Sequence, residues 1–247
     1  MAFWGDYHTH TVYSHGSGTV EDNVAAARER GLKAVAITDH GISGFPENMH
    51  PCDLPAFFAD VKRARDLYPD MTVLAGVEAN LLDAGGTLDM PDGAEDMLDL
   101  IICGYHRARF PDTLGSLFGF WLPNALAPKS SARRRAKNTD AYIRAMQRYR
   151  VGIIAHPLRE ITCDLKALGE AAREYGVYIE LNSKKCLLTR EDFETLAATG
   201  CSFICDSDAH SPGRVGDFSA AEQLDAAGLD RTLIANWNAF PHFRDKI

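Results

Sequence analysis

The chain has no stretch of apolar residues long enough to cross a membrane. Of its 247 residues, 46% are hydrophobic, yet no apolar run approaches the roughly 18–20 residues that a membrane span requires. The first residues also lack a basic segment followed by an apolar run, so no signal peptide is expected. Both absences predict a cytoplasmic protein that does not bind membranes.

Positive charge is scarce as well. The 26 basic and 34 acidic residues give a formal net charge of −8, which argues against broad binding to nucleic acids or acidic lipids. Bound metal ions would still make a local site strongly positive. We therefore expect a small ligand rather than a long nucleic acid, and the charge leaves open whether the chain forms a homo-oligomer.

The six cysteines include no Cys-x-x-Cys pair. A chain of this length buries a large core without a disulfide framework, so reduced and mostly buried thiols are expected. Residues 1–247 are predicted to form one domain.

Seven apolar runs of strand length alternate with segments of helical periodicity. The predicted strands are 3–7, 34–38, 72–77, 98–104, 151–155, 177–181 and 201–205. The predicted helices are 19–31, 55–68, 140–149, 165–175, 190–198 and 219–227, the first opened by a capping box of Thr19 and Asp22. Continuous rather than alternating hydrophobicity in the strands is typical of a parallel sheet covered on both faces, so the pattern predicts an α/β fold.

The positions of the polar side chains favour a closed barrel over an open sheet. An open sheet builds its site from two or three strand ends, whereas ligand-type residues here follow six of the seven predicted strands. Only a barrel readily brings so many strand ends around one centre. We predict a distorted TIM-like (β/α)7 barrel, with residues 110–137 as a long loop over the mouth of the site.

Nine imidazole and carboxylate side chains stand at or just after these strand ends. They are His8, His10, His15, His40, Glu78, His106, His156, Asp208 and His210. Residues two apart on an extended chain point to the same side, so His8 and His10 can reach one ion. One four-coordinate ion needs only about four such ligands, so the sequence predicts a multinuclear site for Zn²⁺, Mn²⁺ or Fe²⁺.

Multinuclear sites of this kind mostly activate water and neutralise the oxygens of a phosphate ester. The carboxylate of Glu78 can bridge two cations, which makes it the predicted shared ligand. Asp39 precedes His40 and is a candidate general acid for the leaving group, with water as the alternative. Asp6 is a candidate for orienting the first histidine pair.

These motifs resemble those of the PHP (polymerase and histidinol phosphatase) family, specifically its stand-alone phosphoesterases. The resemblance rests on Asp6-Tyr7-His8-Thr9-His10, Thr38-Asp39-His40, Gly76-Val77-Glu78, His106, Ala155-His156-Pro157 and Ser207-Asp208-Ala209-His210. It implies a distorted seven-stranded barrel with three metals. The implied ligand sets are His8, His10, Glu78 and Asp208 for the first metal, Glu78, His106 and His156 for the second, and His15, His40 and His210 for the third. Many members carry Asp where this chain has His15, and the histidine form is associated with trinuclear zinc phosphatases.

Basic side chains close to the predicted ligands are candidates for binding phosphate. Arg107, Arg109, Arg159 and Arg214 each follow a predicted ligand closely, and a guanidinium group can fork onto two phosphate oxygens. Arg159 and Arg214 are the preferred candidates. Lys184 follows the sixth strand, whose end carries no assigned ligand and is free for substrate. The basic tract 129–137 is interpreted as a solvated turn that leads into a helix.

The sequence therefore predicts a metal-dependent phosphatase that acts on a small phosphate monoester. Three alternatives remain open: a nuclease or phosphodiesterase acting on nucleotides or DNA ends, a metal-dependent amidohydrolase, and a metal-storage or regulatory binding module. An amidohydrolase often uses a modified lysine as the metal bridge, for which only Lys184 is near a suitable strand end.

The first testable prediction is the metal content. Nine convergent ligands are expected to hold close to three divalent ions per chain, with zinc favoured over manganese and iron. Elemental analysis of protein purified with ample metal measures this number, and a value of one or zero would contradict the trinuclear site while leaving the barrel intact.

Overall fold

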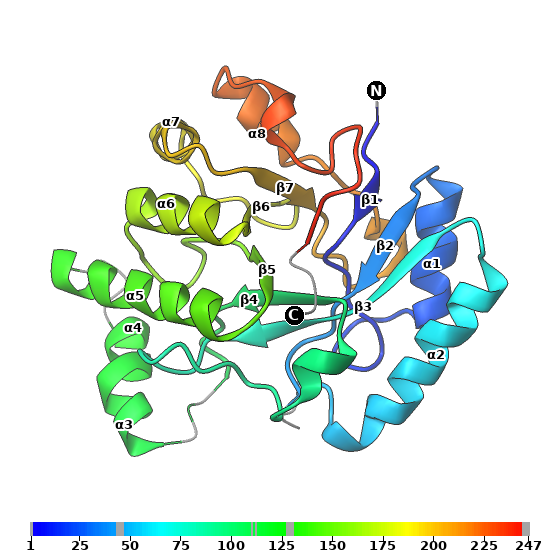
Figure 1. Ribbon diagram of the computed structural model, residues 1–247, viewed down its shortest axis with the longest axis horizontal. Helices are drawn as coiled ribbons and strands as arrows, with labels where there is room; N and C mark the ends of the chain where they lie inside the picture. The colour runs from blue at the N-terminus through cyan, green and yellow to red at the C-terminus, as the bar shows by residue number, and fades with distance from the viewer. Residues whose placement is uncertain (1, 43–46, 110, 112, 127–130, 244–247) are drawn as a thin grey trace.

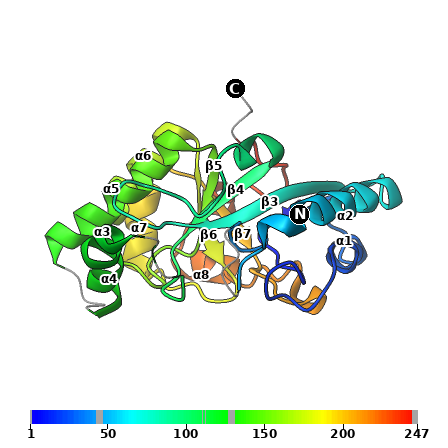
Figure 2. The same cartoon turned by 90° about the horizontal axis from the view of Figure 1, so that it is seen from below.

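Seven parallel strands, each hydrogen-bonded to the next along the chain, form the centre of the computed structural model, which describes residues 2–42, 47–109, 111, 113–126 and 131–243. They curve into a nearly closed barrel with helices outside it (Figures 1 and 2). The strands are β1 (Gly5–Asp6), β2 (Ala34–Ile37), β3 (Thr72–Asn80), β4 (Leu100–Gly104), β5 (Val151–Ile154), β6 (Tyr178–Asn182) and β7 (Phe203–Asp206). The predicted fold class is confirmed.

The strands are buried on both faces, as their continuous hydrophobicity predicts. Every residue of β2, β4, β5 and β7 is buried, because the helices cover one face and the barrel interior covers the other. Neighbouring strands run in parallel register, as in the pairing of Val35 with Val73.

The gap between β1 and β7 is closed in two places. Just beyond the carboxyl ends of these strands, the backbone N–H of His10 donates to the carbonyl of Ala209 at 2.8 Å. Nearer the amino ends, the buried side chain of Asn236 donates to the carbonyls of Gly5 at 2.9 Å and Cys205 at 2.7 Å. The first and last strands are thereby held together, and the loops that follow them lie side by side.

The helices surround the barrel, with α1 and α2 covering the first strands and α5, α6 and α7 covering β4 to β7 (Figure 1). Their bounds are α1 (Val20–Glu29), α2 (Leu54–Leu67), α3 (Leu114–Ser116), α4 (Leu122–Leu126), α5 (Ala132–Arg148), α6 (Leu165–Tyr175), α7 (Arg190–Ala198) and α8 (Ala221–Ala226). The predicted capping box is present: the hydroxyl of Thr19 accepts from the backbone N–H of Asp22, whose carboxylate accepts from the backbone N–H of Thr19.

The barrel interior is divided into an apolar end and a polar end. Side chains from the strands and from the residues directly after them form one buried cluster, which includes Tyr7, Ile102, Ile153 and Ile204. Towards the carboxyl ends of the strands, buried histidines and carboxylates replace these apolar side chains. Packing therefore fixes one end of the barrel and leaves the other for chemistry.

The prediction that residues 110–137 form a long loop over the mouth of the site is wrong for most of this range. Residues 114–126 are helical, as α3, a π-helical segment (Leu117–Trp121) and α4, and Thr113 caps the first turn. Of the described residues between 111 and 126, none lines the cavity at the predicted site. Phe110 lies outside the described residues.

In the basic tract, residues 132–137 are helical rather than a turn. Ser131 caps α5, which begins at Ala132, so Arg133, Arg134 and Arg135 belong to its first turns. Lys129 and Ser130 lie outside the described residues.

The cysteine prediction is confirmed, because all six thiols are free and four of them are buried. Among the described residues, no helix combines the length and the apolar character needed to cross a membrane.

Candidate metal centre

All nine predicted ligands converge at the carboxyl end of the barrel. Each comes from a different place along the chain: His8, His10 and His15 follow β1, His40 follows β2, Glu78 lies in β3, His106 follows β4, His156 follows β5, and Asp208 and His210 follow β7. Parallel strands bring their carboxyl ends to the same side of a barrel. The structure thus brings together residues that are up to 202 positions apart in the sequence, from His8 to His210.

Glu78 lies at the centre of this group and its side chain is fully buried. Its two oxygens face different nitrogens: Oε2 lies 3.2 Å from His8 Nε2, 3.5 Å from His10 Nε2 and 2.9 Å from His40 Nδ1, whereas Oε1 lies 2.7 Å from His156 Nε2 and 3.5 Å from His106 Nε2. A carboxylate placed between two groups of imidazoles has the geometry that a shared ligand of two ions requires.

A glycine in β4 leaves room for this carboxylate. A Cβ atom on Gly104 would come within 2.8 Å of Glu78 Oε1 and within 3.2 Å of the His106 ring. Any larger residue at this position would therefore displace a predicted ligand.

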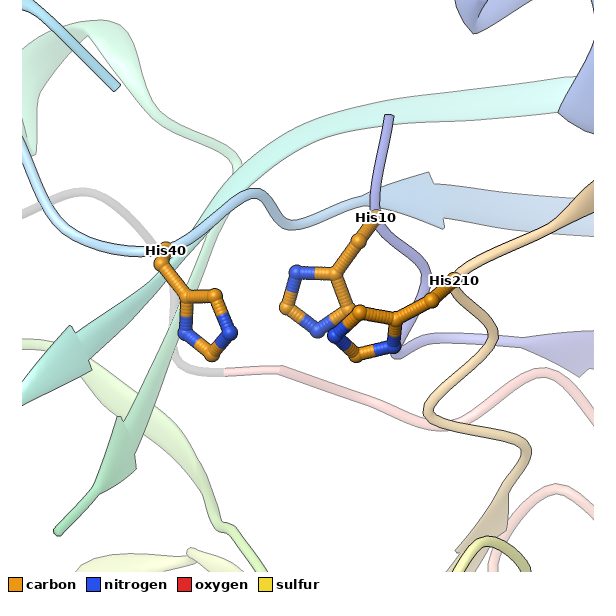
Figure 3. Close-up of side chains that lie close together, drawn as sticks. All are labelled: His10, His40 and His210. Carbon is orange, nitrogen blue, oxygen red and sulfur yellow. The ribbon is translucent and has the colours of Figure 1, made fainter. Parts of the chain in front are cut away.

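His10 and His40 also belong to a second cluster of imidazoles, which includes His210 and His15. Figure 3 shows His40, His10 and His210 around a common space, with His10 between the other two. Their ring centroids lie 4.4 Å (His10–His40) and 4.2 Å (His10–His210) apart. His15 lies beside them, 4.7 Å from His40 and 4.3 Å from His210 between centroids.

Several atoms at the centre are buried without a hydrogen-bond partner. They are His8 Nε2, both ring nitrogens of His10 and Glu78 Oε2. Buried polar atoms are almost always satisfied in folded proteins, because leaving them unpaired costs free energy. Three sets of donor atoms also lie within 4.8 Å of one another, two of which include Glu78. The donor set and its unpaired atoms fit bound divalent cations.

The electrostatic environment favours the deprotonated state that metal ligands need. Burial, together with the neighbouring His40, holds the pKa of His10 well below its usual range. Burial alone would raise the pKa of Glu78, but the rings of His106 and His8 outweigh it and lower that pKa well below the usual range. His8 differs: burial would lower its pKa, yet the carboxylates of Glu180 and Glu78 raise it well above normal.

Two of the histidines form hydrogen bonds through the ring nitrogen that faces away from Glu78. Their partners were not predicted from the sequence. Glu180 Oε1 lies 2.6 Å from His8 Nδ1, and Asn80 Oδ1 lies 2.6 Å from His106 Nδ1. Asn80 is held in turn by the buried Asp89, whose pKa burial raises to about 6. The signal was present, since Glu180 interrupts an apolar strand two residues before its end, but it was not interpreted as part of the site.

The prediction that Asp39 protonates the leaving group conflicts with its position. Burial raises the pKa of Asp39, which taken alone would suit an acid. However, its carboxylate accepts from the backbone N–H and hydroxyl of Thr11 and from the hydroxyl of Ser14, and it does not line the cavity. Asp39 instead fixes the loop that carries His15.

Asp6 also holds two segments of the chain together. Its Oδ1 accepts from the backbone N–H of Ser207 at 3.1 Å, and its Oδ2 accepts from that of Gly216 at 2.8 Å. The carboxylate therefore connects the strand before His8 to the segments on both sides of Asp208.

The ligands open into a cavity of about 170 Å³. Besides ligands, it is lined by Glu47, Asn48, Asn80, Ala108, Arg109, Arg159, Glu160 and Lys184. Arg159 Nη1 donates to Asp208 Oδ2 at 3.1 Å, and Lys184 Nζ lies 3.1 Å from His210 Nδ1. Two of the three predicted phosphate-binding residues therefore face the cavity, together with Arg109, which had not been preferred.

The third, Arg214, is directed elsewhere. Its guanidinium pairs with Asp217 at 2.8 Å, its side chain is 45% exposed, and it does not line the cavity. Proximity to His210 in the sequence was misleading, because the short 3-10 helix Pro212–Arg214 turns the side chain towards its own loop. The prediction for Arg214 is therefore not supported.

The expectation that the end of β6 is free is also wrong. Glu180 and Asn182 are both buried there, and both form hydrogen bonds with residues of the centre. Only Lys184, two residues beyond the strand, faces the cavity.

Comparisons with known proteins agree with this architecture. The family model described as PHP domain matches residues 6–184. A protein named probable phosphatase from Thermoanaerobacter sp. (strain X514) is 30% identical over 242 residues, covering 94% of this chain and 89% of the relative. Another from Caldanaerobacter subterraneus subsp. tengcongensis is 31% identical over 229 residues, covering 89% and 81%.

A solved structure shares the fold at lower identity. It is a histidinol phosphate phosphatase from Lactococcus lactis subsp. lactis, complexed with zinc, L-histidinol and phosphate. It matches with a TM-score of 0.58 and 15% identity over 91% of this chain and 94% of that one.

The position of Glu78 generates the second prediction. Replacing Glu78 by Ala removes the carboxylate that faces both groups of imidazoles, so turnover is expected to be abolished and the metal content to fall by more than one equivalent. Elemental analysis and steady-state kinetics on the same preparation measure both effects. Full activity in the variant would mean that Glu78 is only a polar residue of β3.

Proposed function

The chain belongs to the PHP domain family, and from this premise we propose that it is a metal-dependent phosphatase that hydrolyses a small phosphate monoester. One observation carries the proposal: the nine predicted ligands, with Glu78 at their centre, lie at a cavity that is lined by the cationic side chains of Arg109, Arg159 and Lys184 and by the acidic side chains of Glu47 and Glu160. Histidines supply seven of the nine ligands, a donor set that suits zinc in particular.

When bound, the metals would activate water for attack on phosphorus and neutralise charge on the phosphate oxygens. The role of the protein in this scheme is to hold the ligands and to orient the phosphate. A histidine that binds metal uses one ring nitrogen as the ligand, and the hydrogen bond of the other nitrogen to Glu180 or Asn80 would keep the remaining proton on that side of His8 and His106.

Arg159 and Lys184 are placed to bind the phosphate. Both contact Asp208, Arg159 Nη1 at 3.1 Å from Oδ2 and Lys184 Nζ at 3.6 Å from Oδ1, at the boundary between the ligands and the cavity. Cations fixed in a partly enclosed site stabilise the negative charge that spreads over the phosphoryl oxygens in the transition state. The planar guanidinium of Arg159 can in addition contact two of these oxygens at once.

The size of the cavity favours a small substrate. A space of about 170 Å³ takes a phosphoryl group and part of a small organic group, and the formal net charge of −8 disfavours an extended polyanion. An amidohydrolase with a lysine bridge is disfavoured too, because Glu78 lies between the two groups of imidazoles and Lys184 Nζ lies beside His210 instead.

The experiment that tests the function is a comparison of ester classes. Metal-replete protein is expected to hydrolyse aryl and alkyl phosphate monoesters faster than matched phosphate diesters, with the Glu78→Ala protein as the background control. Preferential turnover of diesters would replace the proposal by a phosphodiesterase, and no turnover of either class by metal-replete protein would reject both.

A further prediction separates phosphate binding from metal binding. Arg159→Ala is expected to retain its metal but to lower kcat/KM by ~10–1000-fold, which corresponds to about 1–4 kcal/mol of transition-state stabilisation. Arg159→Lys should recover only part of this loss, since a point charge lacks the bidentate fork.

Arg214→Ala is the matched control, because it removes an arginine that is equally close to a ligand in the sequence but directed away from the cavity. Its kcat/KM is expected to stay near wild type. Equal effects of the two alanine variants would contradict the assignment of Arg159.

A further inference from the structure

Strand β6 supplies no predicted ligand, yet it places a buried carboxylate directly behind the centre. Glu180 is 1% exposed and lies in the middle of Tyr178–Asn182. Burial of an acidic side chain costs free energy unless hydrogen bonds satisfy it. The partners of Glu180 are therefore informative, and two of its three contacts are to predicted metal ligands.

The first contact orients His8. Glu180 Oε1 lies 2.6 Å from His8 Nδ1. A carboxylate oxygen accepts hydrogen bonds, so Nδ1 carries a proton, and Nε2, 3.2 Å from Glu78 Oε2, is the nitrogen that faces the centre. His8 Nε2 is one of the buried atoms without a hydrogen-bond partner. Metal-bound histidines are commonly fixed by such a carboxylate.

The second contact holds the backbone of another predicted ligand. Glu180 Oε2 accepts from the backbone N–H of His156 at 2.6 Å. His156 has a φ of 28°, in a region that residues other than glycine rarely adopt and that persists only where the surroundings enforce it. The same carboxylate therefore fixes a strained turn whose side chain places Nε2 2.7 Å from Glu78.

The third contact reaches the loop after β7. Asn182 Nδ2 donates to Glu180 Oε2 at 3.0 Å and lies 3.2 Å from Asp208 Oδ2. Asp208 also has a positive φ, of 50°. One amide group thus links the carboxylate of β6 to a predicted ligand that follows β7.

We propose that Glu180 is a positioning residue that holds ligands from β1, β5 and β7 in their metal-binding geometry, although it binds no metal itself. The inference rests on the proposed metal centre. His8 lies at Oε2 of Glu78 and His156 at Oε1, so Glu180 contacts one histidine on each side of the predicted shared ligand, and its loss is expected to affect both sides.

An amide cannot replace this carboxylate, although it has the same shape. The carboxylate meets a donor at each oxygen, the Nδ1 proton of His8 and the N–H of His156. In Glu180→Gln the NH₂ group must face one of them. If the NH₂ group faces His8, the ring proton must move from Nδ1 to Nε2, and Nε2 can no longer bind metal. If the NH₂ group faces His156, it opposes the backbone N–H of a strained turn, so two donors face each other.

The experiment compares Glu180→Gln, Glu180→Asp and, as a control for the chemical change, Glu170→Gln on the exposed surface of α6. Metal content after dialysis against a chelator and metal affinity in chelator-buffered titrations are measured directly. Glu180→Gln is expected to bind metal about 10–100-fold more weakly and to lose more than one equivalent on dialysis. Glu180→Asp, which keeps two acceptor oxygens, should retain more metal, and Glu170→Gln should match wild type.

Kinetics on a phosphate monoester add a second measurement. For Glu180→Gln, kcat is expected to fall while KM changes little, and added metal should restore part of kcat, which it would not do for a folding defect. Circular dichroism of the metal-free proteins verifies that each variant folds.

Wild-type metal affinity in folded Glu180→Gln would overturn the proposal. If Glu180→Gln does not fold, the comparison is made on Glu180→Asp, for which weakened binding of metal supports the proposal and unchanged binding rejects it. These measurements do not require turnover, so failure of the phosphatase assignment would be seen separately, as wild-type protein that binds metal but hydrolyses no ester.

Discussion

The site depends on one carboxylate that is buried among imidazoles at the end of a closed barrel. Glu78 has no exposed surface, and five ring nitrogens lie within 3.5 Å of its oxygens. A buried charge of this kind is tolerated only when partners of opposite charge compensate for the lost hydration. The imidazoles do so in part, and unpaired atoms such as His10 Nε2 and Glu78 Oε2 remain for cations to satisfy. The absence of a side chain at Gly104 is part of the same constraint, since a Cβ there would meet Glu78.

The barrel supplies the rigidity that this arrangement needs. Parallel strands bring the ligands to one end, but hydrogen bonds behind them determine how each ring points. Glu180 and Asn80 orient the rings of His8 and His106, while Asp39 and Asp6 fix the loops on either side. Three of these residues lie in strands and Asp39 lies two residues beyond β2, so the sheet fixes the position of their backbone. The ligand positions therefore follow from the closure of the barrel as much as from the ligands themselves, because Asp6 connects the first strand to the loop beyond the last.

Much of this organisation could be predicted from the sequence, because it depends on local patterns. The strands follow from continuous apolar runs, and Glu78 stands out as a carboxylate that follows one of them. Residues whose place depends on tertiary contacts were assigned less well. Arg214 is close to His210 in the chain, yet a 3-10 turn directs it to Asp217. Asp39 adjoins His40, yet successive residues of a strand face opposite sides, so it contacts Thr11 and Ser14 instead. Glu180 was not assigned to the site because a lone acid in an apolar strand indicates a buried polar partner without showing which ring it contacts.

The cavity holds cationic side chains although the chain as a whole is acidic, and this arrangement has a physical consequence. The chain carries a formal net charge of −8, so its long-range field repels an extended polyanion. Within the cavity, Arg109, Arg159 and Lys184 come from three different loops, and the carboxylates of Glu47, Glu160 and Asp208 offset their charge. Divalent cations held by the predicted ligands would make this balance positive. Charges more than about 10 Å apart are largely screened by salt, whereas partly buried charges are screened much less. A compact anion that enters the cavity would therefore be attracted by the metals and the neighbouring cations, although the surface of the chain repels a polymer of phosphates.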